Sequence, residues 1–321
     1  TFNDRSNDYQ LNQLYLVAER AVRDDAWSVG GRIDLLYGTD HRYAVARGLE
    51  VRGDGSPKWN SGDYGIAMPQ LYMEAFAPIG SGVNVKMGHF YTILGYETVP
   101  APDNFFYSHA YAMQYGEPFT HTGCLAATDV GPLRVQGGLT RGWDNWENGN
   151  DEYGFLGGAS WTSQDERTSL AFALHTGREE GVVSPATNER TTYSTVFSHD
   201  FYGPWSCVLQ HDLGIDRGVR QDGSDATWYG MNMYLFREIT EQWKFGYRFE
   251  WFRDNDGTRV VEGLAADYYQ MAWGLNYSPS DRLKIRPSIR WDWTGARDAR
   301  PFINGTSNEQ LLLDCDVVIQ F

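Results

Sequence analysis

The sequence ends in QLLLDCDVVIQF, residues 310–321, and this stretch decides the fold. Apolar side chains occupy its odd positions from Leu311 to Phe321, whereas Asp314 and Asp316 occupy even positions. Successive side chains of a strand point to opposite faces, so a period of two predicts a strand with one apolar and one polar face. The chain therefore closes on a two-faced strand that stops at an aromatic residue.

The same alternation recurs upstream and predicts about fifteen strands. It is clearest in residues 243–251, where Trp243, Phe245 and Tyr247 alternate with Lys244 and other polar or small residues. Aromatic residues favour strands. The predicted strands are residues 9–20, 27–37, 69–77, 82–90, 122–129, 133–143, 153–161, 168–176, 190–200, 205–213, 227–236, 243–251, 269–277, 283–293 and 310–321.

The connections between these strands alternate in length. Short turns such as FYGP (201–204) and SPSD (278–281) alternate with long polar loops. Barrels of the bacterial outer membrane show this asymmetry, and single-chain examples have even strand numbers. We therefore expect at least one more strand upstream of Thr1, giving about 16, and a barrel of that size encloses an aqueous lumen.

The composition agrees with a β-barrel and disfavours other classes. The chain has 321 residues, 15% of them aromatic, and no run approaches the roughly 18 apolar residues of a transmembrane helix. Because all-β barrels run long as single domains, we expect one domain over residues 1–321. The net charge of −15 makes nucleic acid an unfavourable partner.

The side chains of the two faces indicate which solvent touches each face. A soluble sandwich or barrel would also alternate, with its apolar face inside. Here the apolar face carries large aromatic residues at the strand ends, which is typical of a wall that faces lipid. We therefore predict a transmembrane antiparallel up-and-down β-barrel with water within. The predicted lumen side chains are Arg32, Asp34, Lys86, Arg134, Lys244, Arg248, Glu250, Lys284, Arg286 and Arg290.

Several segments resemble a known family. They are NQLYL (12–16), GRIDLLYGTD (31–40), GHFYTILGYE (88–97), FFYSHAY (105–111) and GEPFTHTG (116–123). Over residues 9–125 above all, the chain resembles the putative β-barrel porin type 2 family of bacterial outer-membrane proteins. The resemblance implies a porin-like barrel of 16 strands, passive solute passage, and a strand ahead of the FNDR segment (2–5).

Further partners follow from the same resemblance. The terminal Phe321 resembles the signal that the barrel-insertion machinery reads, and the wall would contact outer-membrane lipid. By analogy with porins, we expect a homotrimer.

The segment from Tyr91 to Thr120 is the candidate functional loop, because loops this long usually carry a function. In general porins a loop after an early strand folds inward and narrows the lumen. We expect this segment to present Glu97, Asp103 and Glu117 toward wall bases, so that a transverse field orients solutes. The opposing bases would be Lys86, Arg134, Arg248, Arg286 and Arg290, and the alternative is a loop that packs outward as a rim.

Other chemistry finds little support in the sequence. No G-x-S-x-G nucleophile elbow is present, so we expect no enzyme and no cofactor. DNDGT (254–258) lacks the glutamate spacing of a calcium loop, the seven histidines show no metal-ligand spacing, and the three cysteines give no disulfide framework. A glycan-binding protein or glycosidase, and a plugged structural or adhesive barrel, remain the alternatives to a diffusion porin.

Overall fold

Antiparallel strands make up most of the computed structural model, which describes residues 2, 5, 7–60, 62–147, 151–180, 187–296 and 299–321. Three short helical turns, η1 (Thr39–Tyr43), η2 (Ala101–Asp103) and η3 (Ala112–Gly116), accompany the strands. The strands are β1 (Leu14–Arg20), β2 (Ser28–Gly38), β3 (Gly65–Ala77), β4 (Val83–Tyr91), β5 (Thr120–Val130), β6 (Leu133–Thr140), β7 (Gly154–Thr162), β8 (Thr168–Glu180), β9 (Thr187–Asp200), β10 (Trp205–Asp216), β11 (Ala226–Glu238), β12 (Trp243–Asp254), β13 (Ala266–Ser280), β14 (Leu283–Thr294) and β15 (Glu309–Ile319).

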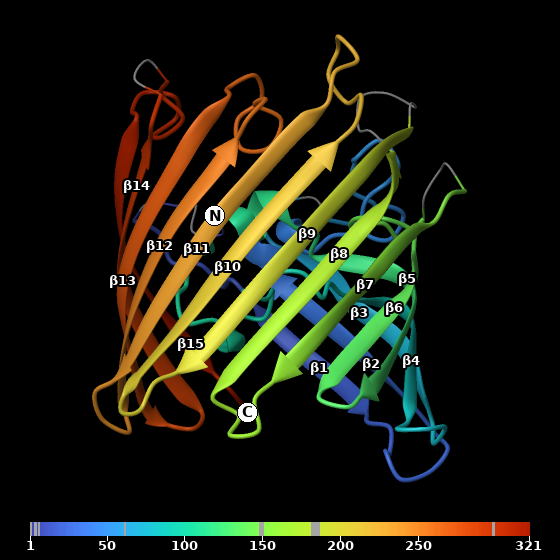
Figure 1. Ribbon diagram of the computed structural model, residues 1–321. Coiled ribbons are helices and arrows are strands. Elements are labelled where there is room, and N and C mark those ends of the chain that lie inside the picture. Colours follow the sequence, from blue (N-terminus) through green and yellow to red (C-terminus); the bar gives the residue numbers. More distant parts are fainter. Residues whose placement is uncertain are drawn as a thin grey trace.

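Each strand pairs with its neighbours in sequence. Within the described residues the strands form one sheet of fifteen in the order β1 to β15, and every pairing is antiparallel. The sheet curls into a barrel of inclined strands (Figure 1). β1 and β15 are the two ends of this order. The predicted all-β up-and-down barrel is therefore confirmed, whereas a sixteenth strand stays a prediction.

The two faces of the sheet have opposite chemistry. Outward-facing Ile33, Leu170 and Leu313 are 44%, 44% and 73% exposed. Arg248 and Arg290, on the other face, are 0% exposed. Because apolar rows cover the outside and charged side chains lie inside, the predicted orientation of the wall is confirmed.

The connections also follow the predicted alternation of lengths. Short turns gather at one end of the barrel and longer connections at the other, and the C-terminus lies beside the short turns (Figure 1). Residues 131–132 and 281–282 are examples of the short class, whereas residues 39–64 and 92–119 belong to the long class. No helix of the described residues is long and apolar enough to cross a membrane.

Several strand boundaries differ from the prediction. The first predicted strand, residues 9–20, is wrong over residues 9–13, because β1 begins at Leu14. There the carbonyls of Leu11 and Asn12 bind the backbone N–H groups of Thr39 and Asp40, which lie in the turn η1 rather than in a strand.

The sixth predicted strand, residues 133–143, was also too long. β6 ends at Thr140, and Gly142 has a φ of 95°, a conformation that glycine adopts easily and a strand does not. Conversely, β12 and β13 extend beyond their predicted ends to Asp254 and Ser280. These extensions lie where polar residues dilute the hydrophobic pattern, so periodicity alone underestimates the strands.

Candidate functional site

Residues 92–119 connect the neighbouring strands β4 and β5 but contact the wall formed by later strands. The Arg286 guanidinium on β14 donates to the carbonyls of Ala101 and Asn104 at 2.8 and 2.6 Å. The Trp228 indole on β11 donates to the carbonyl of Gly116 at 3.0 Å. In Figure 1 the blue-green coil of this segment lies inside the barrel. We call residues 92–119 the inner loop.

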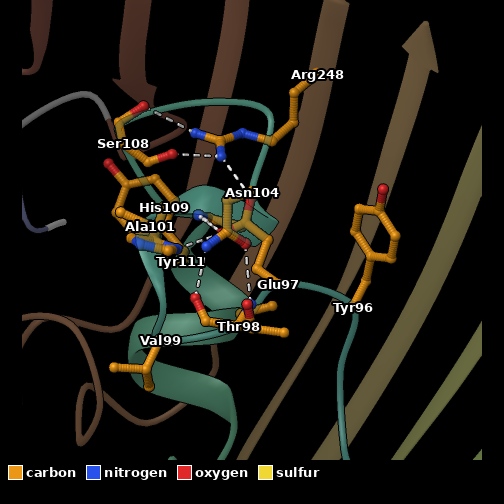
Figure 2. Close-up of polar contacts among 12 residues, drawn as sticks. Tyr96, Glu97, Thr98, Val99, Ala101, Asn104, Ser108, His109, Tyr111 and Arg248 are labelled. Carbon is orange, nitrogen blue, oxygen red and sulfur yellow. Dashed lines mark hydrogen bonds and ion pairs between the residues drawn. The ribbon is translucent and has the colours of Figure 1, made fainter. Parts of the chain in front are cut away.

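Arg248 on β12 binds the middle of the inner loop (Figure 2). Its Nη1 lies 2.7 Å from the carbonyl oxygen of Ser108 and 2.6 Å from Oε1 of Glu97. Its Nε donates to Gln270 on β13 at 2.8 Å. An irregular loop leaves carbonyls without secondary-structure partners, and a buried guanidinium with five N–H groups can satisfy them.

Arg290 and Arg286, both on β14, also bind backbone carbonyls of the inner loop. Arg290 Nη1 donates to the carbonyl of His109 at 2.5 Å, and its Nη2 lies 2.7 Å from Asp292. Arg286 Nε donates to Asp316 on β15 at 2.8 Å. Each arginine thus joins a loop carbonyl to a wall carboxylate. The predicted wall bases Arg248, Arg286 and Arg290 contact the loop directly.

Glu250 holds the start of η3 from the same wall. Its carboxylate accepts the backbone N–H groups of Tyr111 and Ala112 at 2.7 and 2.8 Å. The Tyr111 hydroxyl donates to Asp292 at 2.9 Å. Because the first N–H groups of a helical turn have no partner within it, a wall carboxylate supplies the missing acceptor.

Glu97 is the predicted loop acid that forms an ion pair with a predicted wall base, Arg248. Besides Arg248, it accepts hydrogen bonds from the Ala110 backbone at 2.9 Å and the Tyr234 hydroxyl at 3.0 Å, and it lies 2.9 Å from His109 Nδ1. Burial by itself raises the pKa of a carboxyl, but Arg248, His109 and the Ala110 N–H hold the pKa of Glu97 below its ordinary value. Glu97 is therefore a charged tie between the inner loop and the wall.

Glu117 lies in a different setting near the end of the inner loop. It is 4% exposed, accepts a hydrogen bond from the Gln210 amide, and makes no ion pair with the described residues. Burial, followed by the nearby Asp212 carboxylate on β10, raises the pKa of Glu117 well above its ordinary value. The surroundings thus lower the pKa of Glu97 and raise the pKa of Glu117.

Asp103, the third predicted loop acid, is exposed at the end of η2. The neighbouring Pro102 carbonyl accepts a hydrogen bond from Lys284 at 3.1 Å. Lys86 lies 4.4 Å from the centre of the Tyr72 ring on the adjacent strand. None of the described contacts joins Lys86 to the inner loop.

Other predicted lumen residues are engaged within the wall. Arg134 lies 3.5 Å from Asp129 beside the short turn after β5. Arg32 binds Asp34 at 2.6 Å, and the Lys244 ammonium lies 5.4 Å from the centre of a phenylalanine ring. The field between three loop acids and five bases stays a prediction, as does the role of Phe321, which is 89% exposed.

The sequence reasoning missed the glycines that admit the inner loop. A Cβ on Gly246 would lie 2.3 Å from the Phe105 ring, and one on Gly274 would lie 3.0 Å from the Phe106 ring. Glycine inside a strand often marks close approach by another segment, so the signal was present at both positions. Asp292 and Gln210, which also bind the loop, carried no comparable signal.

The described part of the chain contains no candidate metal site. No group of three or more His, Cys, Asp or Glu side chains there is arranged to hold a metal ion. Among the described cysteines, Cys124, Cys207 and Cys315 are all free thiols.

Several solved structures share this architecture. OprB of Pseudomonas putida aligns with a TM-score of 0.63 at 10% identity, covering 96% of this chain and 87% of that one. OmpT of Vibrio cholerae aligns with a TM-score of 0.60 at 9% identity, over 95% and 88% of the two chains. The channel DcaP of Acinetobacter baumannii gives 0.58 at 11% identity, over 94% and 82%. At these identities the likeness establishes the fold.

Sequence comparison establishes the family. No curated protein matches the chain by sequence. A family model described as putative beta-barrel porin-2, OmpL-like, matches residues 1–321. This family and the shared fold give the chain a porin's role in the bacterial outer membrane, in agreement with the predicted function and location. The chain thus belongs to the putative beta-barrel porin-2, OmpL-like family.

Proposed function

We propose that the chain forms a water-filled channel through which small hydrophilic solutes or ions diffuse passively. The observation that carries the proposal is the orientation of the wall, with apolar rows outside and charged groups inside. Hydrocarbon solvates the first surface, and the second suits a polar passage. The whole chain acts as one barrel domain, without enzymatic activity.

The inner loop sets the width of this passage. Arg248, Glu250 and Arg290 hold it against the wall of β12 and β14, so it occupies part of the cross-section at a fixed place. Replacing Glu97, Asp103 and Glu117 together with Gln, Asn and Gln tests the constriction. We expect altered single-channel conductance and ion selectivity in planar bilayers, and unchanged values would contradict a constriction at this loop.

A homotrimer in outer-membrane lipid is the proposed assembly. One structure with this fold is described as a trimer form of Vibrio cholerae OmpT, which supports the proposal at the level of the fold. The exposed terminal Phe321 would be read by the insertion machinery. Native mass spectrometry from detergent would test the trimer, and a variant lacking Phe321 should insert more slowly into membranes in cells.

A plugged structural barrel is the second candidate, because part of the interior is packed with apolar side chains. One buried cluster joins Tyr111 of the inner loop to Trp143, Trp228, Phe252 and Tyr268. Reconstitution of the full chain into planar bilayers separates the two functions. A porin gives discrete conductance steps, whereas a plugged barrel gives none although it folds and inserts.

A further inference from the structure

The outer face of β1 to β4 carries a hollow that takes no part in the passage. One row of opposed residues crosses it, in which Arg20 lies opposite Gly31, Gly31 opposite Met73, and Met73 opposite Met87. Because Gly31 has no side chain, the row is open between Arg20 and Met73. The hollow measures about 560 Å³, and ligand pockets span about 300–1,000 Å³.

Apolar side chains surround this hollow. Ala18, Ile33 and Leu71 form the next row on the same face. Ile33, Met73 and Met87 are 44%, 65% and 61% exposed, and on this wall they face hydrocarbon. Methionine is unbranched and fits irregular shapes, so Met73 and Met87 adapt to a flexible partner. The hollow therefore suits an acyl chain.

Arg20 is the charged member of this apolar surface. Its side chain is exposed, and no ion pair or side-chain hydrogen bond within the described part of the chain involves its guanidinium. The neighbouring Glu19 faces the lumen, where it lies 3.5 Å from Arg32. An arginine on the lipid face is costly unless its head reaches the interface, where an anion can bind it. Arg20 therefore has a place for an anionic partner.

A second hollow, of about 990 Å³, shares Arg20 and continues toward the connection between β1 and β2. Its lining includes Arg23 and Trp27. The Arg23 guanidinium lies 3.9 Å from Asp25, and both side chains are at least 70% exposed, so this pair is weak. Trp27 is 69% exposed, and tryptophan on the wall of a membrane protein is typical of the head-group level. An apolar hollow thus adjoins a basic one.

The two hollows lie near one membrane surface. β1 ends at Arg20, and the connection to β2, residues 21–27, lies at the end of the barrel where the short turns gather (Figure 1). Short turns face the periplasm in bacterial barrels. The two arginines are therefore close to the head groups of the periplasmic leaflet, and the apolar hollow lies deeper in the hydrocarbon.

A second copy of the chain fits these bases less well than a lipid does. Among the described strand side chains, the outward-facing acids are Glu189, Asp267 and Glu309. They lie near the long-loop ends of β9, β13 and β15, which is the opposite end of the barrel. Copies related by an axis along the membrane normal face each other at equal depth, so these acids do not meet Arg20.

We propose that the two hollows form a binding site for an anionic phospholipid of the periplasmic leaflet. Arg20 and Arg23 bind its phosphate, and one acyl chain lies against Ile33, Met73 and Met87. Guanidinium groups bind phosphate through paired, charge-assisted hydrogen bonds, and basic pockets of membrane proteins bind anionic head groups. The net charge of −15 gives the chain no general attraction for such a lipid, so binding depends on these local bases.

Native mass spectrometry of the full chain in detergent, with added phosphatidylglycerol or phosphatidylcholine, is the first test. We expect the wild type to retain the anionic lipid about fivefold more than the neutral one, and Arg20→Gln to lose about that factor. Arg237→Gln is the matched control, because Arg237 is also exposed on the outer face near a short turn but lines neither hollow. No preference in the wild type, or equal losses in both variants, would overturn the site.

A second measurement locates the lipid on the wall. Val85→Cys, beside Met87 on the outer face of β4, is labelled with a small fluorophore in a chain whose three native cysteines are replaced by serine or alanine. The control chain keeps only Cys207, which is likewise the third residue of its strand after a short turn. Brominated phosphatidylglycerol, diluted in phosphatidylcholine vesicles, should quench the label at residue 85 about twofold more than the label at residue 207. Equal quenching would contradict the site.

Ala18→Phe fills the apolar hollow and separates the lipid from a second copy of the chain. We expect weaker retention of phosphatidylglycerol with the oligomeric state unchanged. Dissociation of a lipid-free oligomer by this substitution would show that a second copy covers the hollow and would overturn the lipid site. Lipid retention is measured independently of conductance, so a chain that binds the lipid without conducting would refute the proposed channel alone.

Discussion

Replacing Arg248 by methionine is the sharpest test of how the inner loop is held. The change removes a buried ion pair at 2.6 Å to Glu97 and a hydrogen bond at 2.7 Å to the Ser108 carbonyl. It also strands the Glu97 carboxylate, whose side chain is 5% exposed. Breaking a buried pair by removing one partner costs about 3–5 kcal/mol, and we expect a loss of that size in the free energy of unfolding.

Equilibrium unfolding in denaturant from micelles measures this loss, and single-channel recording measures its effect on the loop. We expect larger current fluctuations in Arg248→Met, because the middle of the inner loop loses its tie to β12. Arg134→Met is the matched control, since its partner Asp129 lies at 3.5 Å and both side chains are at least half exposed. Pairs of that kind contribute about 0–1 kcal/mol.

The double variant Arg248→Met with Glu97→Gln separates charge from packing. Removing both partners leaves no uncompensated buried charge, so the double variant should recover part of the lost stability. If Arg248→Met is no less stable than Arg134→Met, and its currents match those of the wild type, the inner loop is not held by Arg248.

Three further predictions follow from other parts of the structure. Gly246→Ala should lower stability and alter conductance, because its Cβ would lie 2.3 Å from the Phe105 ring, whereas Gly137→Ala, whose nearest contact is 3.6 Å from the Phe155 ring, should do neither. Leu313→Arg should impair insertion by roughly 2–4 kcal/mol because it places a charge against lipid, whereas Gln136→Arg on the inner face should insert normally; liposome folding yields compare them. Burial raises the pKa of Asp144 to about 6, above its ordinary value of 3.8. The folded chain thus binds this proton more tightly than the unfolded chain, and stability falls as the pH rises from about 4 through about 6. Asp144→Asn keeps the acceptor for Thr120 and should be more stable than the wild type above about pH 6, by roughly 3 kcal/mol, with no difference below about pH 4. Parallel pH profiles of the two proteins would contradict this assignment.

The strands could be predicted from the sequence because their signal is local. A period of two in residues 243–251 fixes both the strand β12 and the face that each side chain takes. The ends were less predictable, since Leu11 and Asn12 bind a turn that only the folded chain brings near. Periodicity reports on the wall and carries little information about the tertiary partners of an irregular segment.

In the candidate site, too, side-chain chemistry was predictable from the sequence, whereas the contacts of the irregular loop were not. Charge and position singled out Arg248 and Glu97, and the structure brings these two together. Nothing in the sequence indicated that Arg286 and Arg290 would bind loop carbonyls, because backbone acceptors leave no mark in side-chain identity. Asp212 was missed because a single acid among 42 in the chain is not distinctive until Gln210 and Glu117 lie beside it.

The anchoring of the inner loop has a consequence for the order of assembly. Ser108 and Tyr111 are bound by Arg248 and Glu250, which follow them by about 140 residues. Contacts so distant in sequence form slowly, because closing a long stretch of chain must precede them. While the early strands assemble, this segment therefore has its N-terminal partners, such as Gln13, which binds Val99 and Ala101, but lacks its ties to β12. The bore acquires its final dimensions only when the twelfth and later strands arrive.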